Sequence, residues 1–149
     1  MSEFEEGTSF QPVLADPVDN ASSAKTVVFM TGKFYYDLAK ERSALGLEDS
    51  VALIRIEELS PFPYQQVMDI VSQYTEVREF CWMQEEHKNA GAWSHVRDKL
   101  RMALQEESHG PTELRYLGRK PSALPATGIG SRYKEQLNAL LRMPFEKHL

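Results

Sequence analysis

The sequence predicts an α/β fold in which helices cover both faces of a mostly parallel sheet. Short apolar runs alternate with segments of helical periodicity along the chain, and this order is typical of parallel strands joined by crossover helices. The clearest apolar run, Thr26–Met30, is continuous rather than alternating, as expected of a strand that is buried on both faces. A chain of 149 residues has the size of one ordinary domain.

The first 24 residues differ from the rest of the chain. They contain five acidic residues and no lysine or arginine, whereas a targeting presequence is basic and poor in acids. Because glycine, proline and polar residues bury little apolar area, we expect residues 1–24 to form an extended arm and residues 25–149 to form the folded domain. The apolar residues that can anchor the arm are Phe4, Phe10, Val13 and Leu14.

The first half of the domain contains two expected strands with a helix between them. The apolar run at 26–30 predicts the first strand. Apolar residues at helical spacing then predict a helix over 33–45. The β-branched run at 50–56 predicts the second strand. Two prolines in 60–63 indicate a rigid turn just before the next helix.

The second half of the domain repeats this alternation. Apolar residues at positions i, i+3, i+4 and i+7 predict a helix over 67–74. A third strand at 79–83 is followed by a helix whose apolar face includes residues 93 to 104. A short fourth strand at 114–117 and a last helix at 131–141 complete the pattern.

Composition argues against several classes of function. The single cysteine, Cys81, lies in an apolar run, which indicates a buried core residue rather than a reactive thiol. No apolar run approaches the length of a membrane span, and there is no basic helix for a nucleic acid. From Arg115 onward the chain has seven Lys/Arg against two Glu. This segment faces an acidic partner or anionic ligand, or is an ordinary solvated surface.

The first candidate site is the turn formed by Thr31, Gly32 and Lys33, where the first strand passes into a helix. Ligands of α/β folds collect beyond the carboxyl ends of the strands, and the backbone N–H groups of a helix start attract anions. Arg55, at the end of the neighbouring strand, would share such an anion with Lys33. Because the turn lacks the first glycine and final Ser/Thr of a P-loop, a simple tight turn is the alternative.

The second candidate is the polar stretch Glu85, Glu86, His87, Lys88 and Asn89 at the end of the third strand. It lacks the spaced histidine pair of a helical zinc site and the exposed Ser or Cys of a nucleophilic centre. We therefore expect side chains that contact a neighbouring domain or subunit, with Asn89, Glu85 or Glu86 capping the following helix. On this interpretation the chain holds no catalytic residue and no metal of its own.

Four motifs, in order and with sensible spacing, carry a resemblance to a known family. They resemble the C-terminal domain of the thiamine-dependent decarboxylase of the 2-oxoglutarate dehydrogenase complex, and the related 2-oxoadipate dehydrogenase decarboxylase shares much of the pattern. The resemblance extends from about Gly7 to about Leu141, and the segment after Gly128 is nearer to the oxoadipate type. The motifs are VFMTGKFYYDL at 28–38, RIEELSPFP at 55–63, QEEHKN at 84–89 and PATG at 125–128.

This resemblance implies a fold like the transketolase C-terminal domain, with three αβα layers around a mixed five-stranded sheet. It also implies that thiamine diphosphate and Mg²⁺ are bound by upstream domains of a longer, homodimeric chain, so that this domain is non-catalytic and binds no cofactor. The whole enzyme of the family oxidatively decarboxylates a 2-oxo acid and transfers the acyl group to a lipoyl arm of the succinyltransferase component.

The resemblance further implies roles for the two candidate sites. The stretch 85–89 would lie at an interdomain contact or at the rim of the active-site channel, and the domain would contribute to dimer packing. The turn 31–33 with Arg55 would bind a regulatory nucleotide such as acetyl-CoA or AMP. The expected compartment is the mitochondrial matrix in a eukaryote and the cytoplasm in a bacterium. The alternative is a stand-alone truncated paralogue that acts as a regulatory or adaptor module of the complex.

Overall fold

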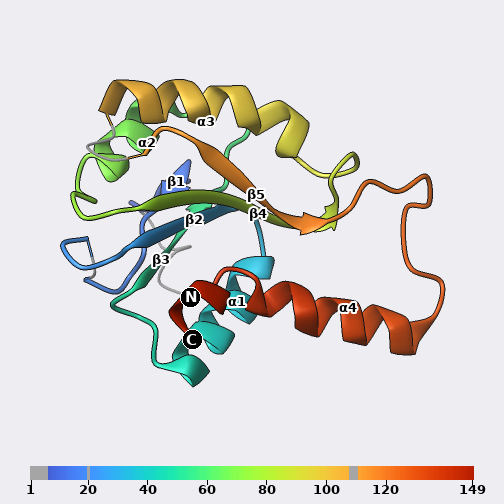
Figure 1. The fold of residues 1–149 in the computed structure, drawn as a ribbon. Helices are drawn as coiled ribbons and strands as arrows, with labels where there is room; N and C mark the ends of the chain where they lie inside the picture. Colours follow the sequence, from blue (N-terminus) through green and yellow to red (C-terminus); the bar gives the residue numbers. More distant parts are fainter. Residues whose placement is uncertain (1–6, 20, 108–110) are drawn as a thin grey trace.

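The computed structural model describes residues 7–19, 21–107 and 111–149. At its centre lies a five-stranded sheet in the order β1-β3-β2-β4-β5, with α2 and α3 on one face and α1 and α4 on the other (Figure 1). The strands are β1 (Val13–Leu14), β2 (Thr26–Met30), β3 (Val51–Ile56), β4 (Glu79–His87) and β5 (Leu114–Arg119). The helices are α1 (Phe34–Leu45), α2 (Tyr64–Val71), α3 (Trp93–Glu107), α4 (Gly130–Arg142) and the 3₁₀ turn η2 (Glu146–His148).

The sheet is mixed and mostly parallel, which confirms the predicted fold class. Strands β2, β3, β4 and β5 run parallel to their neighbours, and β1 alone pairs in antiparallel orientation, with Val13 opposite Ile56. Strand β1 comes from the segment 1–24, so the described part of this segment adds a fifth strand to the sheet. Phe4 lies outside the described residues, and Phe10 is exposed.

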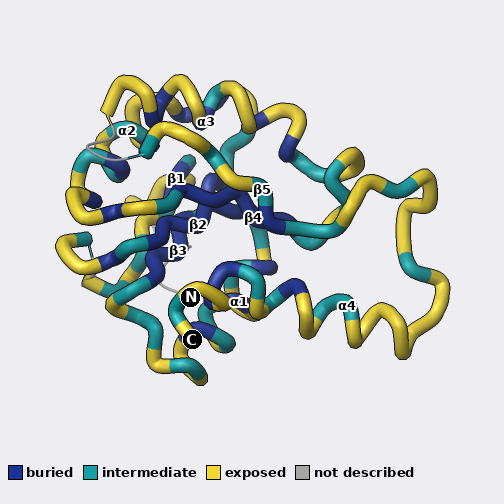
Figure 2. The backbone as a smooth tube through the Cα atoms, in the orientation of Figure 1, coloured by how far each residue is buried: buried dark blue, intermediate teal, exposed yellow. Residues whose placement is uncertain are grey.

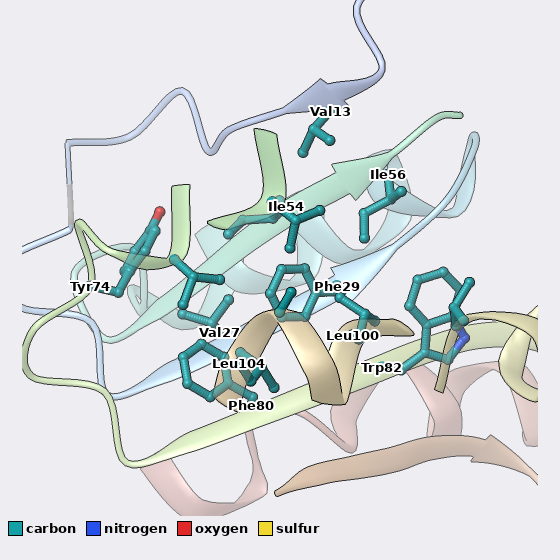
Figure 3. Packing of buried hydrophobic residues seen from close by; sticks show 14 of the residues in the cluster. Val13, Val27, Phe29, Ile54, Ile56, Tyr74, Phe80, Trp82, Leu100 and Leu104 are labelled. Atoms are coloured by element: carbon teal, nitrogen blue, oxygen red, sulfur yellow. The ribbon is translucent and has the colours of Figure 1, made fainter. Parts of the chain in front are cut away.

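The core consists of two layers, one on each face of the sheet. Along β4, Phe80 and Trp82 face α2 and α3, whereas Cys81 and Met83 face α1 and α4, because successive side chains of a strand point to opposite faces. Strand β2 is buried throughout, and the middle of β4 and most of β3 are buried as well (Figure 2). Figure 3 shows the first layer, in which Phe29 and Phe80 stack with ring centroids 6.1 Å apart.

The polar stretch is part of β4, which is longer than the sequence predicts. We expected the third strand to end at residue 83, where the apolar run ends. In the structure β4 continues to His87, and after a register shift His87 pairs with Arg119 of β5. Strand β5 likewise runs two residues further than predicted. Polar residues extend both strands because backbone pairing does not require apolar side chains.

A buried ion pair joins the N-terminal segment to the sheet and to α1. Both terminal nitrogens of Arg42, Nη1 and Nη2, donate to the Asp16 carboxylate. Arg42 Nη1 also donates to the carbonyl oxygen of Val51 at 2.8 Å. Asp16 Oδ2 accepts a further bond from the Leu53 N–H at 2.7 Å. The two side chains are 4% and 0% exposed, so this network holds residues 13–16 against the edge of the sheet.

The sequence predicts that Cys81 is a buried core residue and that no apolar run is long enough to span a membrane. Cys81 is fully buried, and burial raises the pKa of its thiol to about 12, so it is a protonated core residue at neutral pH. Within the described ranges, none of the helices combines the length and the apolar character that a membrane span requires.

Candidate functional site

Two groups of polar side chains lie near the carboxyl ends of the parallel strands. The first, here named the Arg55 cluster, follows β2 and β3. The second, here named the Arg119 hollow, lies beyond β4 and β5. The Arg55 cluster comprises Gly32, Tyr35, Tyr36, Arg55 and Glu57, and the Arg119 hollow is lined by Glu85, Glu86, His87, Arg119, Pro125, Ala126, Thr127 and Tyr133.

Arg55 is held by two aromatic rings and one carboxylate. Its guanidinium carbon lies 4.5 Å from the ring centroid of Tyr35 and 5.5 Å from that of Tyr36, within range of a cation–π contact. Its Nη1 atom lies 3.8 Å from Glu57 Oε1. Arg55 therefore presents a positive charge with a fixed orientation at the carboxyl edge of the sheet.

The predicted anion site at the turn 31–33 already faces a carboxylate of the chain itself. Gly32 has φ of 69°, a left-handed conformation that suits glycine, and its N–H donates to Glu57 Oε1 at 3.3 Å. The structure thus brings Gly32 and Arg55 together through Glu57, while Thr31 is half-buried and Lys33 is exposed. Sequence reasoning missed Glu57, although its position two residues after Arg55 was an available signal.

Gln84 organises the end of β4 and the start of α3. Its side-chain oxygen accepts from Trp82 Nε1 at 3.0 Å and from the backbone N–H of Trp93 at 2.9 Å, and its nitrogen donates to the His87 carbonyl at 3.0 Å. The predicted cap of this helix by Asn89, Glu85 or Glu86 is therefore wrong. Gln84 takes this role because it lies on the same face of β4 as Trp82, toward α3.

Asn89 and His87 contact the loop that follows β5, whereas Lys88 lies near an aromatic ring of β5 itself. The Asn89 side chain exchanges two hydrogen bonds with the backbone of Ser122, at 2.9 and 3.0 Å. His87 Nδ1 lies 3.0 Å from the carbonyl oxygen of Lys120. Lys88 Nζ lies 5.1 Å from the ring centroid of Tyr116. These contacts fix the loop 120–122 against the end of β4.

Gly91 lies against the side chain of Gln84. Any larger residue at position 91 would have to push the Gln84 side chain away. A Cβ atom at position 91 would be 2.4 Å from Gln84 Nε2, whereas one at Gly128 would meet no atom within 4 Å. We expect Gly91→Ala to lower the free energy of unfolding by about 1–3 kcal/mol and Gly128→Ala to change it by less than about 0.5 kcal/mol. Urea denaturation of both variants measures the difference. Equal midpoints would contradict the close approach seen here.

The Arg119 hollow is a small, half-open depression with a volume of about 160 Å³, lined by both charged and apolar groups. Arg119 Nε donates to the carbonyl oxygen of Glu85 at 2.9 Å, and Arg119 Nη1 donates to Gln136 Oε1. The Tyr133 hydroxyl donates to Glu85 Oε1 at 2.6 Å, and this bond raises the pKa of the Tyr133 phenol above its ordinary value. The hollow thus joins β4, β5 and the first turn of α4. Sequence reasoning did not single out Arg119.

The chemistry of these side chains does not fit a resident metal ion. Among residues 7–19, 21–107 and 111–149, no three His, Cys, Asp or Glu side chains are arranged to hold one.

Comparison with known proteins places the chain in a family. The model of the 2-oxoglutarate dehydrogenase C-terminal family matches residues 1–145. A probable 2-oxoadipate dehydrogenase complex component E1 homolog of Dictyostelium discoideum is 41% identical over 95% of this chain and 15% of its own length. The mitochondrial 2-oxoglutarate dehydrogenase of Caenorhabditis elegans is 43% identical over 97% of this chain and 14% of its own length. The human 2-oxoadipate dehydrogenase complex component E1 is 37% identical over 97% of this chain and 15% of its own length.

A solved structure has the same fold. A chain described as a split gene transketolase, inactive β4 tetramer, superposes with a TM-score of 0.58 at 13% identity, covering 96% of this chain and 45% of its own. This likeness confirms the predicted transketolase-like fold. The family model and the relatives confirm the family that the sequence resembles. The chain spans only about one seventh of the length of those relatives. The chain belongs to the family of the 2-oxoglutarate dehydrogenase C-terminal domain.

Proposed function

We propose that the chain serves as the non-catalytic C-terminal domain of a thiamine-dependent decarboxylase acting on 2-oxoglutarate or 2-oxoadipate. The observation that carries this proposal is how much of this chain, and how little of each relative, the matches cover. Relatives that are 2-oxo acid dehydrogenase components match nearly the whole chain, and the matched part is only 14–15% of their length. In this proposal thiamine diphosphate and Mg²⁺ are bound by the remainder of the decarboxylase, together with its homodimer mate.

The end of β4 and the loop after β5 form the proposed contact with the rest of the decarboxylase. Glu86 and Asn89 are exposed, and the apolar side chains of Leu124 and Ile129 are 69% and 60% exposed. A contiguous apolar patch rimmed by polar residues marks an interaction site, and we propose that Leu124 and Ile129 contribute to such a patch. The lipoyl arm of the succinyltransferase would approach the active-site channel along this rim.

Reconstitution tests the proposal. A decarboxylase of this family that ends before the region matched here is mixed with the 149-residue chain, thiamine diphosphate and Mg²⁺. We expect the chain to bind the truncated enzyme and to restore ferricyanide reduction with 2-oxoglutarate or 2-oxoadipate.

Controls separate this role from its alternatives. The 149-residue chain alone is expected to show no turnover, so decarboxylation by the pure chain would contradict the proposal. Failure to bind the truncated enzyme, together with binding to the intact enzyme or to the succinyltransferase, would instead support an adaptor module. Because two of the relatives are named as mitochondrial enzymes, we propose the mitochondrial matrix for a eukaryotic source and the cytoplasm for a bacterial one.

A second proposed function is binding of a regulatory nucleotide at the Arg55 cluster. The oriented Arg55 charge and the Gly32 N–H support it, and both are at present directed to Glu57. An anionic group such as a phosphate of acetyl-CoA or AMP would therefore have to displace the Glu57 carboxylate. Glu57 would act as a built-in competitor that weakens the site.

This competition predicts opposite effects of two substitutions. We expect Glu57→Gln to tighten binding of acetyl-CoA or AMP by about three- to tenfold and Arg55→Gln to weaken it by at least about tenfold. Isothermal titration calorimetry measures both affinities. The control is Glu106→Gln on the exposed face of α3, which removes the same charge far from the cluster. Equal affinities for Glu57→Gln and Glu106→Gln would exclude the Arg55 cluster as the site.

A further inference from the structure

The Arg119 guanidinium carries a charge that no described carboxylate balances. Three arginines of the described chain are buried or half-buried, namely Arg42, Arg55 and Arg119. Arg42 is paired with Asp16, and Arg55 lies within ion-pair distance of Glu57. Arg119 donates only to neutral acceptors, the Glu85 carbonyl and the Gln136 amide. Charges that are withdrawn from water are normally paired, so Arg119 departs from the pattern of the other two.

One nitrogen of Arg119 is also without a hydrogen bond. The Nη2 atom is inaccessible to solvent and has no partner among the described residues. The ring of Tyr133 lies over the guanidinium, with its centroid 5.3 Å from the central carbon. A charged donor left unsatisfied in a buried position is destabilising. An acceptor that reaches this nitrogen would remove that destabilisation.

We propose that the Arg119 hollow is a binding site for a small oxyanion, a carboxylate or a phosphate, with Arg119 as its principal donor. The volume of about 160 Å³ has room for an ion of acetate or phosphate size. Tyr133, which lines the hollow, lies in the first turn of α4. Because Nη2 is inaccessible to solvent, a side chain has to move before an anion can reach it, and we assign this movement to Tyr133, whose ring lies over the guanidinium.

Two carboxylates in the lining determine which anion is preferred. The Glu85 side chain accepts the Tyr133 hydroxyl, and the Glu86 side chain belongs to an exposed residue. Both repel a negative ligand, so the site favours a singly charged ion over a multiply charged one. Removal of the Glu85 charge should therefore strengthen binding, because the amide of glutamine still accepts the Tyr133 hydroxyl. This inference does not depend on the proposed function in a decarboxylase.

Titration of the 149-residue chain tests the site. Sodium acetate and potassium phosphate are added at constant ionic strength, with chloride as the balancing anion, while NMR follows the Arg119 Nε–H signal. We expect a saturable shift with at least one of the two anions. The anion that binds more tightly shows whether the site prefers a carboxylate or a phosphate. We expect Glu85→Gln to tighten this binding several-fold and Arg119→Gln to weaken it by about tenfold or more. Because the second variant lacks the Arg119 Nε–H group, its binding is measured from the backbone signals of residues 126–127.

The control is Arg101→Gln, which removes the same charge from the exposed surface of α3. It should leave the affinity unchanged. Non-saturating shifts, or equal losses in the Arg119 and Arg101 variants, would show general attraction of anions and overturn the proposal. If Arg119→Gln does not fold, Glu85→Gln decides the question, because unchanged or weaker binding by that variant also overturns it. Neither outcome involves the decarboxylase, so failure here leaves the reconstitution result intact.

Discussion

Replacement of Asp16 by alanine is expected to lower the free energy of unfolding by about 3–5 kcal/mol. Among the described residues, Asp16 is the only carboxylate paired with the Arg42 side chain, which is 4% exposed. The substitution also leaves the Leu53 N–H of β3 without its acceptor. An unpaired buried charge and an unpaired buried donor add their costs, and this is a large part of the stability of a domain of this size.

The matched control for Asp16→Ala is Asp19→Ala. Asp19 lies in the same segment but is exposed, so its loss should change the free energy of unfolding by less than about 0.5 kcal/mol. Urea denaturation of both variants gives the comparison. A double variant, Asp16→Leu with Arg42→Met, should recover much of the loss, since apolar residues can replace a buried pair without leaving a charge behind. Similar midpoints for Asp16→Ala and Asp19→Ala would disprove the role of the pair.

Replacement of Gln84 by methionine is expected to lower the free energy of unfolding by about 2–5 kcal/mol. Methionine has nearly the shape of glutamine but no carbonyl oxygen, so Trp82 Nε1 and the Trp93 N–H both lose their acceptor. Each unpaired buried donor costs about 1–3 kcal/mol. The start of α3 and the end of β4 should loosen together, because Gln84 is the side chain that bonds to both.

Two measurements distinguish this local effect from a general loss of stability. The chain has two tryptophans, so an NMR spectrum contains two indole N–H signals, and that of Trp82 should shift and exchange faster in Gln84→Met. The control is Gln65→Met on α2, where an exposed glutamine bonds only to Asp69 and its loss should cost less than about 0.5 kcal/mol. An unchanged Trp82 signal would show that Gln84 is not its acceptor in solution.

Local sequence patterns were sufficient for the helices α1 to α4 and for every strand except β1, which lies in the segment predicted to be an extended arm. Continuous apolar runs predicted β2, β3 and β4, and helical periodicity predicted α1 to α4, because burial on two faces or on one face leaves a different spacing of apolar residues. The family was also recognisable in the sequence, since its four motifs are short and continuous. The bounds of β4 and β5 were less accurate, because polar residues continue the pairing beyond the apolar runs.

The tertiary structure alone decided which polar side chains meet. Asp16 and Arg42 are separated by 26 positions, and Glu85 and Tyr133 by 48, so no local spacing indicates either pair. Gln84 rather than Asn89 receives the Trp93 N–H because the twist and pleat of β4 direct its side chain toward α3. The sequence by itself determined the strands, helices and family of this protein, through patterns that depend on neighbours in the chain. Its buried charges and the composition of its two polar sites depend on contacts between distant segments, which exist only once the sheet and both helical layers have packed.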